Sequence, residues 1–190
     1  LRSPEVDKAL QTFFRGYYRV DWVACYRTVP SERKVASWLW HSDSYPPKIC
    51  RLFLHLTAVN AETGATDFMN REDTMAYRRA GYFGQYKEER TGDLDQFAKE
   101  HGLAYRPFHF DANAGDATFF DMNFFHRVVA PRTQFRDVIQ MQFLPNPIPW
   151  EEQYKKDGVD SLTPRGGFQK DPRITGAMLA SADKGSGGMM

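Results

Sequence analysis

The chain has 190 residues, which suffices for one domain with a hydrophobic core and is too short to expect two of ordinary size. Its formal net charge is +1 and its Lys and Arg residues are scattered, so composition indicates neither a nucleic-acid-binding surface nor an acidic partner. Cys25 and Cys50 form no disulfide framework, and no apolar run is long enough to span a membrane.

These features lead us to expect a soluble, cytoplasmic protein that binds neither nucleic acid nor membrane, while composition leaves the oligomeric state open. Because the sequence begins with Leu1 rather than Met, we expect the natural N-terminus to lie upstream.

Capping residues and apolar runs predict the elements of the first half of the chain. Ser3 and Pro4 favour the start of an amphipathic helix that Gly16 ends. Runs of aromatic and β-branched residues then predict four strands, at residues 17–29, 35–41, 49–59 and 65–69.

The pattern then becomes helical. Asn70 is a candidate cap for a helix that ends at Gly81, and Asp93 for a second helix that ends at Gly102, so residues 70–102 are predicted to be a helical insertion. Four further strands are predicted at residues 105–111, 116–122, 125–129 and 135–144. At least eight strands favour a sandwich or a jelly roll, so the expected fold class is mainly β with flanking helices and this insertion.

The composition changes after the proline-rich stretch 145–149. Half of the 14 glycines lie between Gly158 and Gly188. We therefore expect one domain over residues 1–149 and a partly disordered C-terminal extension over residues 150–190.

A histidine and an aspartate stand at the end of the strand predicted at 35–41. His41 and Asp43 are two residues apart, so in an extended chain their side chains project to the same side. His126 lies on a later predicted strand after 82 intervening residues and is the third candidate ligand. Two imidazoles and one carboxylate suit ferrous iron with three positions left open, and zinc is the main alternative for the same ligands.

Spacing separates this group from a second His-x-Asp pair, His109 and Asp111. A jelly roll must fit about four strands of roughly five residues between the ligand pair and the distal histidine. The second pair leaves only 14 residues before His126, whereas the first pair leaves ample room. We therefore assign the metal to His41, Asp43 and His126. A hydrogen-bonded His–Asp pair without metal is the alternative.

Arg136 lies ten residues after His126, at the start of the last predicted strand. Alternation places it on the polar side of that strand, and if the apolar side packs outward, the guanidinium faces the interior and needs an anion such as a carboxylate. The alternative is a polar face that meets water. Arg132, in a predicted loop, is the rival for the same role.

The strand predicted at 49–59 has a similar polar front, made of Arg51, Phe53 and His55. Arg51 and His55 are candidate pocket residues, but we do not expect them to touch substrate.

The order of these motifs resembles the iron(II)- and 2-oxoglutarate-dependent dioxygenases of the phytanoyl-CoA dioxygenase superfamily. The resemblance covers residues 17–145 and rests on three stretches: Trp-His-x-Asp at 40–43, LFLHLTAVNAETGAT at 52–66 and NAGDATFFDMNFFH at 113–126. It implies a double-stranded β-helix, a form of jelly roll. Relatives usually continue after the glycine turn into Pro-Gly-Ser-His, whereas this chain reads Met-Asn-Arg-Glu at 69–72, so an acyl-CoA substrate is not expected.

The resemblance also implies roles for single residues. Iron(II) is expected on His41, Asp43 and His126, the distal carboxylate of the cosubstrate 2-oxoglutarate on Arg136, and Phe53 beside the cosubstrate. Trp40 is expected to help Phe53 exclude water from the site.

The implied activity is oxidation of a small molecule held under the segment 70–102, with formation of succinate and carbon dioxide. Two other functions stay open, a non-catalytic or zinc-containing jelly-roll binding protein and a peptide or protein hydroxylase on the same fold. Halogenation is disfavoured, because it needs the position of Asp43 to be free for a halide.

Overall fold

The computed structural model describes residues 3–32, 36–43 and 48–158. The chain divides into two units, residues 1–150 and 151–190. Most of the expected C-terminal extension lies outside the described residues; its described part carries helix α4 (Trp150–Lys156). None of the described helices is long and apolar enough to cross a membrane.

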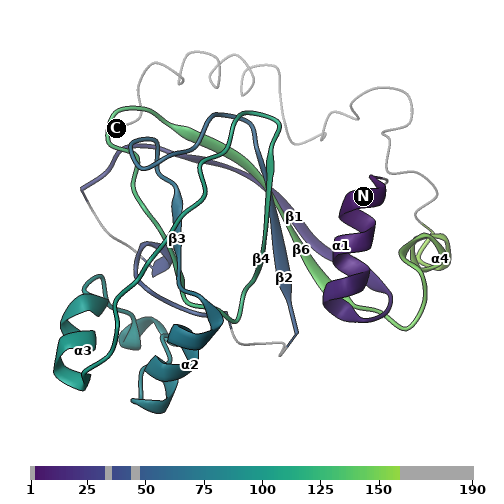
Figure 1. The fold of residues 1–190 in the computed structure, drawn as a ribbon. Helices are drawn as coiled ribbons and strands as arrows, with labels where there is room; N and C mark the ends of the chain where they lie inside the picture. The colour runs from purple at the N-terminus through teal and green to yellow at the C-terminus, as the bar shows by residue number, and fades with distance from the viewer. Residues whose placement is uncertain (1–2, 33–35, 44–47, 159–190) are drawn as a thin grey trace. The chain divides into compact units, whose positions relative to one another are not determined.

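The first unit is mainly antiparallel sheet with flanking helices (Figure 1). The described strands are β1 (Tyr18–Thr28), β2 (Cys50–His55), β3 (Thr66–Phe68), β4 (Ala117–Asp121), β5 (His126–Val128) and β6 (Arg136–Pro145). Four of them form one sheet in the order β1-β6-β2-β4, and β3 pairs with β5 in a second, smaller sheet. Closure of these sheets into a jelly-roll barrel stays a prediction.

Helices α1 (Pro4–Phe14), α2 (Arg71–Arg79) and α3 (Leu94–His101) begin at the residues that the capping pattern predicted. The short 3-10 helices η1 (Ala36–Trp38) and η2 (Lys87–Glu89) were not predicted. The side chains of Ser3, Asn70 and Asp93 each accept a hydrogen bond from a backbone N–H in the first turn, which satisfies a donor that the helix itself leaves unpaired. Helix α3 ends at Gly102, whose φ of 63° is the left-handed conformation that glycine adopts most readily.

Two predicted strands are wrong. The described part of 35–41 contains η1 and two isolated bridges, Trp40 with Thr91 and His41 with His126. Its backbone therefore pairs with two different segments, one residue with each, and does not pair with a single neighbouring strand along its length. The segment 105–111 has a single isolated bridge, Phe108 with Phe68, within the described chain. The expected eight strands are accordingly six in the described residues.

Aromatic residues fill the space between the two sheets. Phe53 of β2 and Phe68 of β3 both meet Phe120 of β4 in edge-on contacts, with ring centroids 5.0 and 4.9 Å apart. Val138 of β6 belongs to the same buried cluster. Burial of each such side chain contributes about 1.5–3 kcal/mol, so this cluster holds the sheets face to face.

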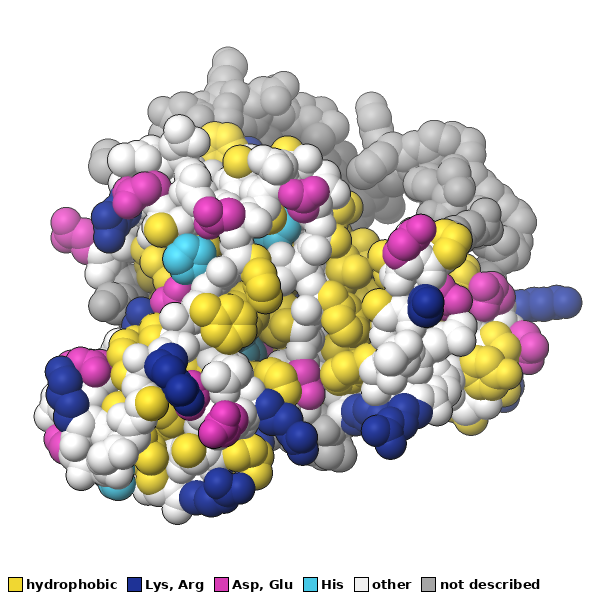
Figure 2. Space-filling model, viewed as in Figure 1, with side chains coloured by type: hydrophobic (Ala, Val, Ile, Leu, Met, Phe, Trp, Pro, Cys, Tyr) yellow, Lys and Arg dark blue, Asp and Glu magenta, His cyan; other side chains and the backbone are white. Residues whose placement is uncertain are grey.

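The segment 70–102 forms a second core around Trp40. The residues packed there are Trp40, Met69, Tyr77, Tyr82, Leu94, Ala98 and Phe125. Charged side chains lie on the outside of this segment among apolar ones, at the lower left of Figure 2. The predicted insertion is thus a folded helical layer. Trp40 packs against it and directly precedes His41 in the chain.

Candidate metal centre and adjacent cavity

His41, Asp43 and His126 come together because two backbone segments pair. The N–H of each histidine donates to the carbonyl oxygen of the other, at 3.0 and 2.9 Å, and the N–H of Asp43 donates to Met122 at 2.9 Å. Their candidate ligand atoms all lie within 4.8 Å of one another. Ligand atoms about 2.1 Å from one ion and on the same side of it lie about 3 Å from one another, so side-chain rotations that draw these atoms together would give the three residues a common centre.

Backbone carbonyls orient both imidazoles. Nδ1 of His41 lies 2.8 Å from the carbonyl oxygen of Leu39. Nδ1 of His126 lies 2.8 Å from that of Phe124. A carbonyl oxygen only accepts, so each Nδ1 carries the proton and each Nε2 is left with a lone pair, which is the tautomer that a metal binds.

His126 fits a metal by its burial as well. Its side chain is 4% exposed and lies 3.7 Å from the Asp43 carboxylate. Its Nε2 is buried without a hydrogen-bond partner among the described residues. Burial, followed by the neighbouring His41, lowers the pKa of His126 well below its ordinary value. Burial likewise lowers the pKa of His41, against the opposing effect of Asp43. Neutral imidazoles beside a carboxylate are a suitable donor set for a divalent cation.

Arg78 of α2 clamps the two segments that carry the candidate ligands. Its Nη2 donates to Oγ of Ser42 at 3.1 Å and to the carbonyl oxygen of Asn123 at 2.8 Å. Ser42 stands between His41 and Asp43, and Asn123 precedes His126 by three residues. No motif in the sequence pointed to Arg78, because its two partners are distant in the chain.

The residues that follow α2 support the same segment from behind. The hydroxyl of Tyr82 donates to the carbonyl oxygen of Trp40 at 2.7 Å. Gly84 has a φ of 58°, and a Cβ atom there would lie 3.0 Å from that oxygen and 3.1 Å from Cα of His41. A side chain at position 84 would therefore push on the backbone that carries a candidate ligand.

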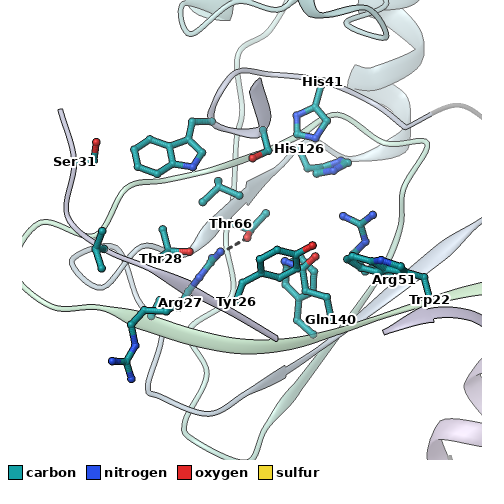
Figure 3. Close-up of a pocket in the computed structure, with 16 residues that line it drawn as sticks. Trp22, Tyr26, Arg27, Thr28, Ser31, His41, Arg51, Thr66, His126 and Gln140 are labelled. Carbon is teal, nitrogen blue, oxygen red and sulfur yellow. Dashed lines mark hydrogen bonds between the residues drawn. The ribbon is translucent and has the colours of Figure 1, made fainter. Parts of the chain in front are cut away.

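A cavity of about 730 Å³ adjoins the two histidines (Figure 3). Its walls come from the two sheets, from η1 and from the residues that follow β1 and η1: Trp22, Tyr26, Arg27, Thr28, Val29, Ser31, Ser37, Trp38, His41, Arg51, Phe53, Thr66, His126, Val128, Arg136 and Gln140. None of these described lining residues belongs to the segment 70–102. The helices of that segment pack against Trp40 instead. This cavity therefore does not support the expectation that substrate lies under the segment, which stays a prediction.

Arg136 is buried in the wall of this cavity, with 2% of the residue exposed. Its Nη1 donates to the carbonyl oxygen of Gly64 at 2.7 Å and to Oγ1 of Thr66 at 3.2 Å, and its Nε has no partner in the described part of the chain. Both partners are neutral. Burial lowers the pKa of Arg136 to about 10, so the guanidinium stays charged at neutral pH.

Arg132 and Trp40 lie elsewhere. Arg132 is on the surface, 3.0 Å from the Glu62 carboxylate, and its side chain is 71% exposed. Trp40 points into the helical layer, with the Arg127 guanidinium 4.8 Å from its ring centre. It does not line the cavity, contrary to the expectation that it helps Phe53 to exclude water there. Phe53 is buried and does line it. Trp22, Tyr26 and Trp38, which the sequence did not single out, form much of the remaining wall.

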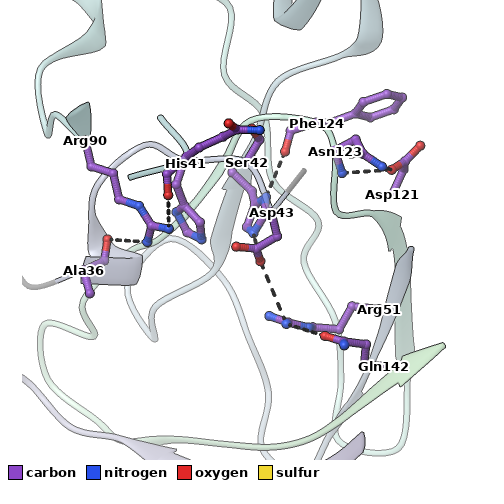
Figure 4. A network of polar contacts seen from close by, with 12 residues as sticks. Ala36, His41, Ser42, Asp43, Arg51, Arg90, Asp121, Asn123, Phe124 and Gln142 are labelled. Carbon is purple, nitrogen blue, oxygen red and sulfur yellow. Dashed lines mark hydrogen bonds and ion pairs between the residues drawn. The ribbon is translucent and has the colours of Figure 1, made fainter. Parts of the chain in front are cut away.

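Arg51 of β2 lies beside the candidate ligands. Its Nη2 is 3.9 Å from the Asp43 carboxylate and donates to Oε1 of Gln142 at 3.2 Å (Figure 4). Its guanidinium also lies 5.5 Å from the ring centre of Trp22. Burial lowers its pKa. The sequence placed Arg51 on the polar front of this strand, and the structure adds that it borders the metal group.

Solved structures with a similar fold share little sequence with this chain. The epimerase SnoN in complex with Fe3+, alpha ketoglutarate and nogalamycin RO matches with a TM-score of 0.53 and 14% identity over 86% of this chain and 64% of its own. The non-heme alpha ketoglutarate dependent carbocyclase SnoK matches at 0.51 and 15% over 80% and 62%. HygX from Streptomyces hygroscopicus with iron bound matches at 0.51 and 10% over 77% and 66%.

The chain thus spans less than two thirds of the length of each of these structures. At such identities the likeness concerns the fold. No protein-family model matches the sequence, and a search of curated proteins finds no match.

Proposed function

We infer that this protein is an iron(II)- and 2-oxoglutarate-dependent oxygenase, similar to the phytanoyl-CoA dioxygenase superfamily, that acts on a small molecule. One observation carries the proposal: the cavity lined by His41 and His126, which form the candidate metal group with Asp43, is also lined by Arg136, a buried guanidinium whose described partners are all neutral. A buried charge without a counter-ion costs several kcal/mol, so this position is suited to a ligand that supplies the anion.

In this proposal iron is held by Nε2 of His41, Nε2 of His126 and the Asp43 carboxylate. The hydrogen bonds from both Nδ1 atoms to backbone carbonyls fix the rings in the required orientation. These three protein ligands would leave coordination positions of the metal free for other molecules.

Arg136 binds the distal carboxylate of 2-oxoglutarate. The carbonyl oxygen of Gly64 and the hydroxyl of Thr66 hold one end of its guanidinium, while Nε is left without a described partner. Gly64 can bring its carbonyl this close because it has a φ of 88°, and a Cβ atom there would lie 2.8 Å from the carbonyl oxygen of Val129. A planar fork matches a carboxylate with two parallel hydrogen bonds.

Iron and 2-oxoglutarate together would supply oxidation of a substrate C–H bond, with succinate and carbon dioxide as coproducts. The chain contributes orientation and shelter. Phe53 packs against Phe120 and closes the wall of the cavity between β2 and β4, which limits access of water from that side. The fold likeness to the SnoN complex, whose description names Fe3+ and alpha ketoglutarate, supports the same pair of cofactors here.

Anaerobic loading with Fe(II) and 2-oxoglutarate, followed by oxygen, tests the activity. The expected result is succinate above the level of an Asp43→Ala control. Calorimetric titration of 2-oxoglutarate into zinc-loaded protein supplies a readout that needs no turnover. If 2-oxoglutarate neither binds the metal-loaded protein nor yields succinate, the proposal is wrong.

A further inference from the structure

Arg51 belongs to a row of side chains that crosses the large sheet. The strand register sets Trp22 of β1 opposite Gln142 of β6, and Gln142 opposite Arg51 of β2. These three therefore share one face of the sheet, the face that borders the cavity. In Figure 3 Arg51 and Trp22 lie side by side, below the two histidines.

The guanidinium of Arg51 is poorly satisfied for a group with five donors. It has one hydrogen bond to Gln142 at 3.2 Å and a loose ion pair with Asp43 at 3.9 Å, and its Nε is buried with no partner among the described residues. Its side chain is 18% exposed. Solvent can therefore accept few hydrogen bonds from the N–H donors of Arg51 that these contacts leave unpaired.

The other arginines of the cavity have partners or a role already. Arg27 makes two hydrogen bonds to Asp137, at 2.8 and 2.7 Å, and the proposed function gives Arg136 to the cosubstrate. With iron, Asp43, Arg136 and doubly negative 2-oxoglutarate in place, the formal charges cancel. The charge of Arg51 is left over beside the metal.

We propose that Arg51 binds a carboxylate of the primary substrate, so that the substrate is a small organic acid. The inference rests on the proposed function, because Asp43 is otherwise free to pair with Arg51. The apolar body of the acid contacts Trp22 and Trp38, flat aromatic walls of the same cavity. A cavity of about 730 Å³ is within the range of about 300–1,000 Å³ that ligand pockets occupy, and leaves space beyond the cosubstrate.

Two sources of a carboxylate must be separated, the substrate and the metal-side carboxylate of 2-oxoglutarate. The probes are benzoate and benzamide, which have nearly the same shape and differ in charge. Both are titrated into the full chain loaded with Zn(II) and 2-oxoglutarate, with heat or NMR shifts as readout. Wild type should bind benzoate at least about tenfold more tightly than benzamide, the factor that one charge-assisted hydrogen bond provides.

Arg51→Gln should abolish this preference. It should leave the affinity for 2-oxoglutarate within about twofold of wild type, which corresponds to about 0.4 kcal/mol of binding free energy. Arg51→Lys, which keeps the charge and loses the fork, should retain part of the preference. Arg27→Gln is the matched control, because Arg27 lines the same cavity but is already paired with Asp137, and it should bind both probes as wild type does.

Three results would overturn the role of Arg51. First, wild type does not prefer benzoate. Second, the preference survives in Arg51→Gln, as it would if benzoate bound the metal itself. Third, Arg51→Gln weakens 2-oxoglutarate by more than about twofold, which assigns Arg51 to the cosubstrate. Absence of 2-oxoglutarate binding to wild type instead refutes the proposed function. The benzoate comparison on protein loaded with zinc alone then still decides whether Arg51 binds a carboxylate.

Discussion

Replacing Arg78 by Met is expected to weaken metal binding although Arg78 touches none of the candidate ligand atoms. The change keeps an unbranched apolar stem and removes the guanidinium, which lies 5.7 Å from the ring centre of Phe125. It removes the two hydrogen bonds to Ser42 and Asn123, at 3.1 and 2.8 Å. The segments of His41 and His126 then lose a direct link.

The magnitude follows from those two contacts. A hydrogen bond to a charged group contributes about 1.5–3 kcal/mol, but Ser42 keeps its bond to the carbonyl oxygen of Phe83 at 3.1 Å, so the free energy of unfolding should fall by about 2 kcal/mol. Residues that orient metal ligands typically change affinity by about 10–100-fold. Since Arg78 acts through the backbone, we expect the lower end, about tenfold.

Competition titration with a zinc chelator measures the affinity, and urea unfolding of the metal-free chain measures the stability. Arg79→Met is the control, because Arg79 lies on the same helix and is exposed. If Arg78→Met loses stability while its zinc affinity stays within twofold of Arg79→Met, then the clamp is structural and the reasoning is refuted.

Three further outcomes are expected. Gly84→Ala should cost about 1–2 kcal/mol of stability and also lower zinc affinity, because the left-handed backbone and the contact at 3.1 Å with Cα of His41 both oppose a Cβ atom; unchanged zinc binding would contradict this. Arg136→Lys should weaken 2-oxoglutarate by about tenfold in calorimetry, whereas Arg132→Lys should not, and equal effects would remove the distinction between them. In metal-free protein, burial lowers the pKa of His55, so on acidification the unfolded chain takes up a proton at this residue before the folded chain does. The free energy of unfolding should therefore fall as the pH drops below about 6.5. In urea titrations between about pH 7.5 and 5, His55→Gln should show a smaller fall in this free energy than wild type.

Local sequence signals determined helices α1, α2 and α3 and most of the strands. Ser3, Asn70 and Asp93 act on backbone groups within the next three residues, so the pattern of neighbours is enough to place the helix starts. Five of the six described strands fall inside predicted ones, and β6 extends one residue past its prediction, to Pro145. The reason is the same, since alternation and β-branched content are properties of a short stretch.

The segment 35–41 shows where this approach stops. Its aromatic content is typical of a strand, yet Trp40 pairs with Thr91 and His41 with His126. A strand needs a partner along its whole length, and the partner is set by where distant parts of the chain arrive. Composition alone therefore could not exclude the strand.

The candidate site divides in the same way. Sequence spacing grouped His41, Asp43 and His126, and the structure brings their ligand atoms within 4.8 Å. Only the tertiary structure put Arg136 in the cavity and Arg132 on the surface. A strand fixes which residues share a face, but not whether that face meets water or another sheet.

Tertiary structure alone also decided what surrounds the ligands. The contacts of Arg78 with Ser42 and Asn123 cross 36 and 45 residues of sequence, and the position of Arg51 beside Asp43 depends on how β2 is packed. Residue types and their order thus determined which side chains could bind a metal. The geometry and charge around them arise from non-local packing, because burial and hydrogen bonding depend on segments that meet only after the chain has folded.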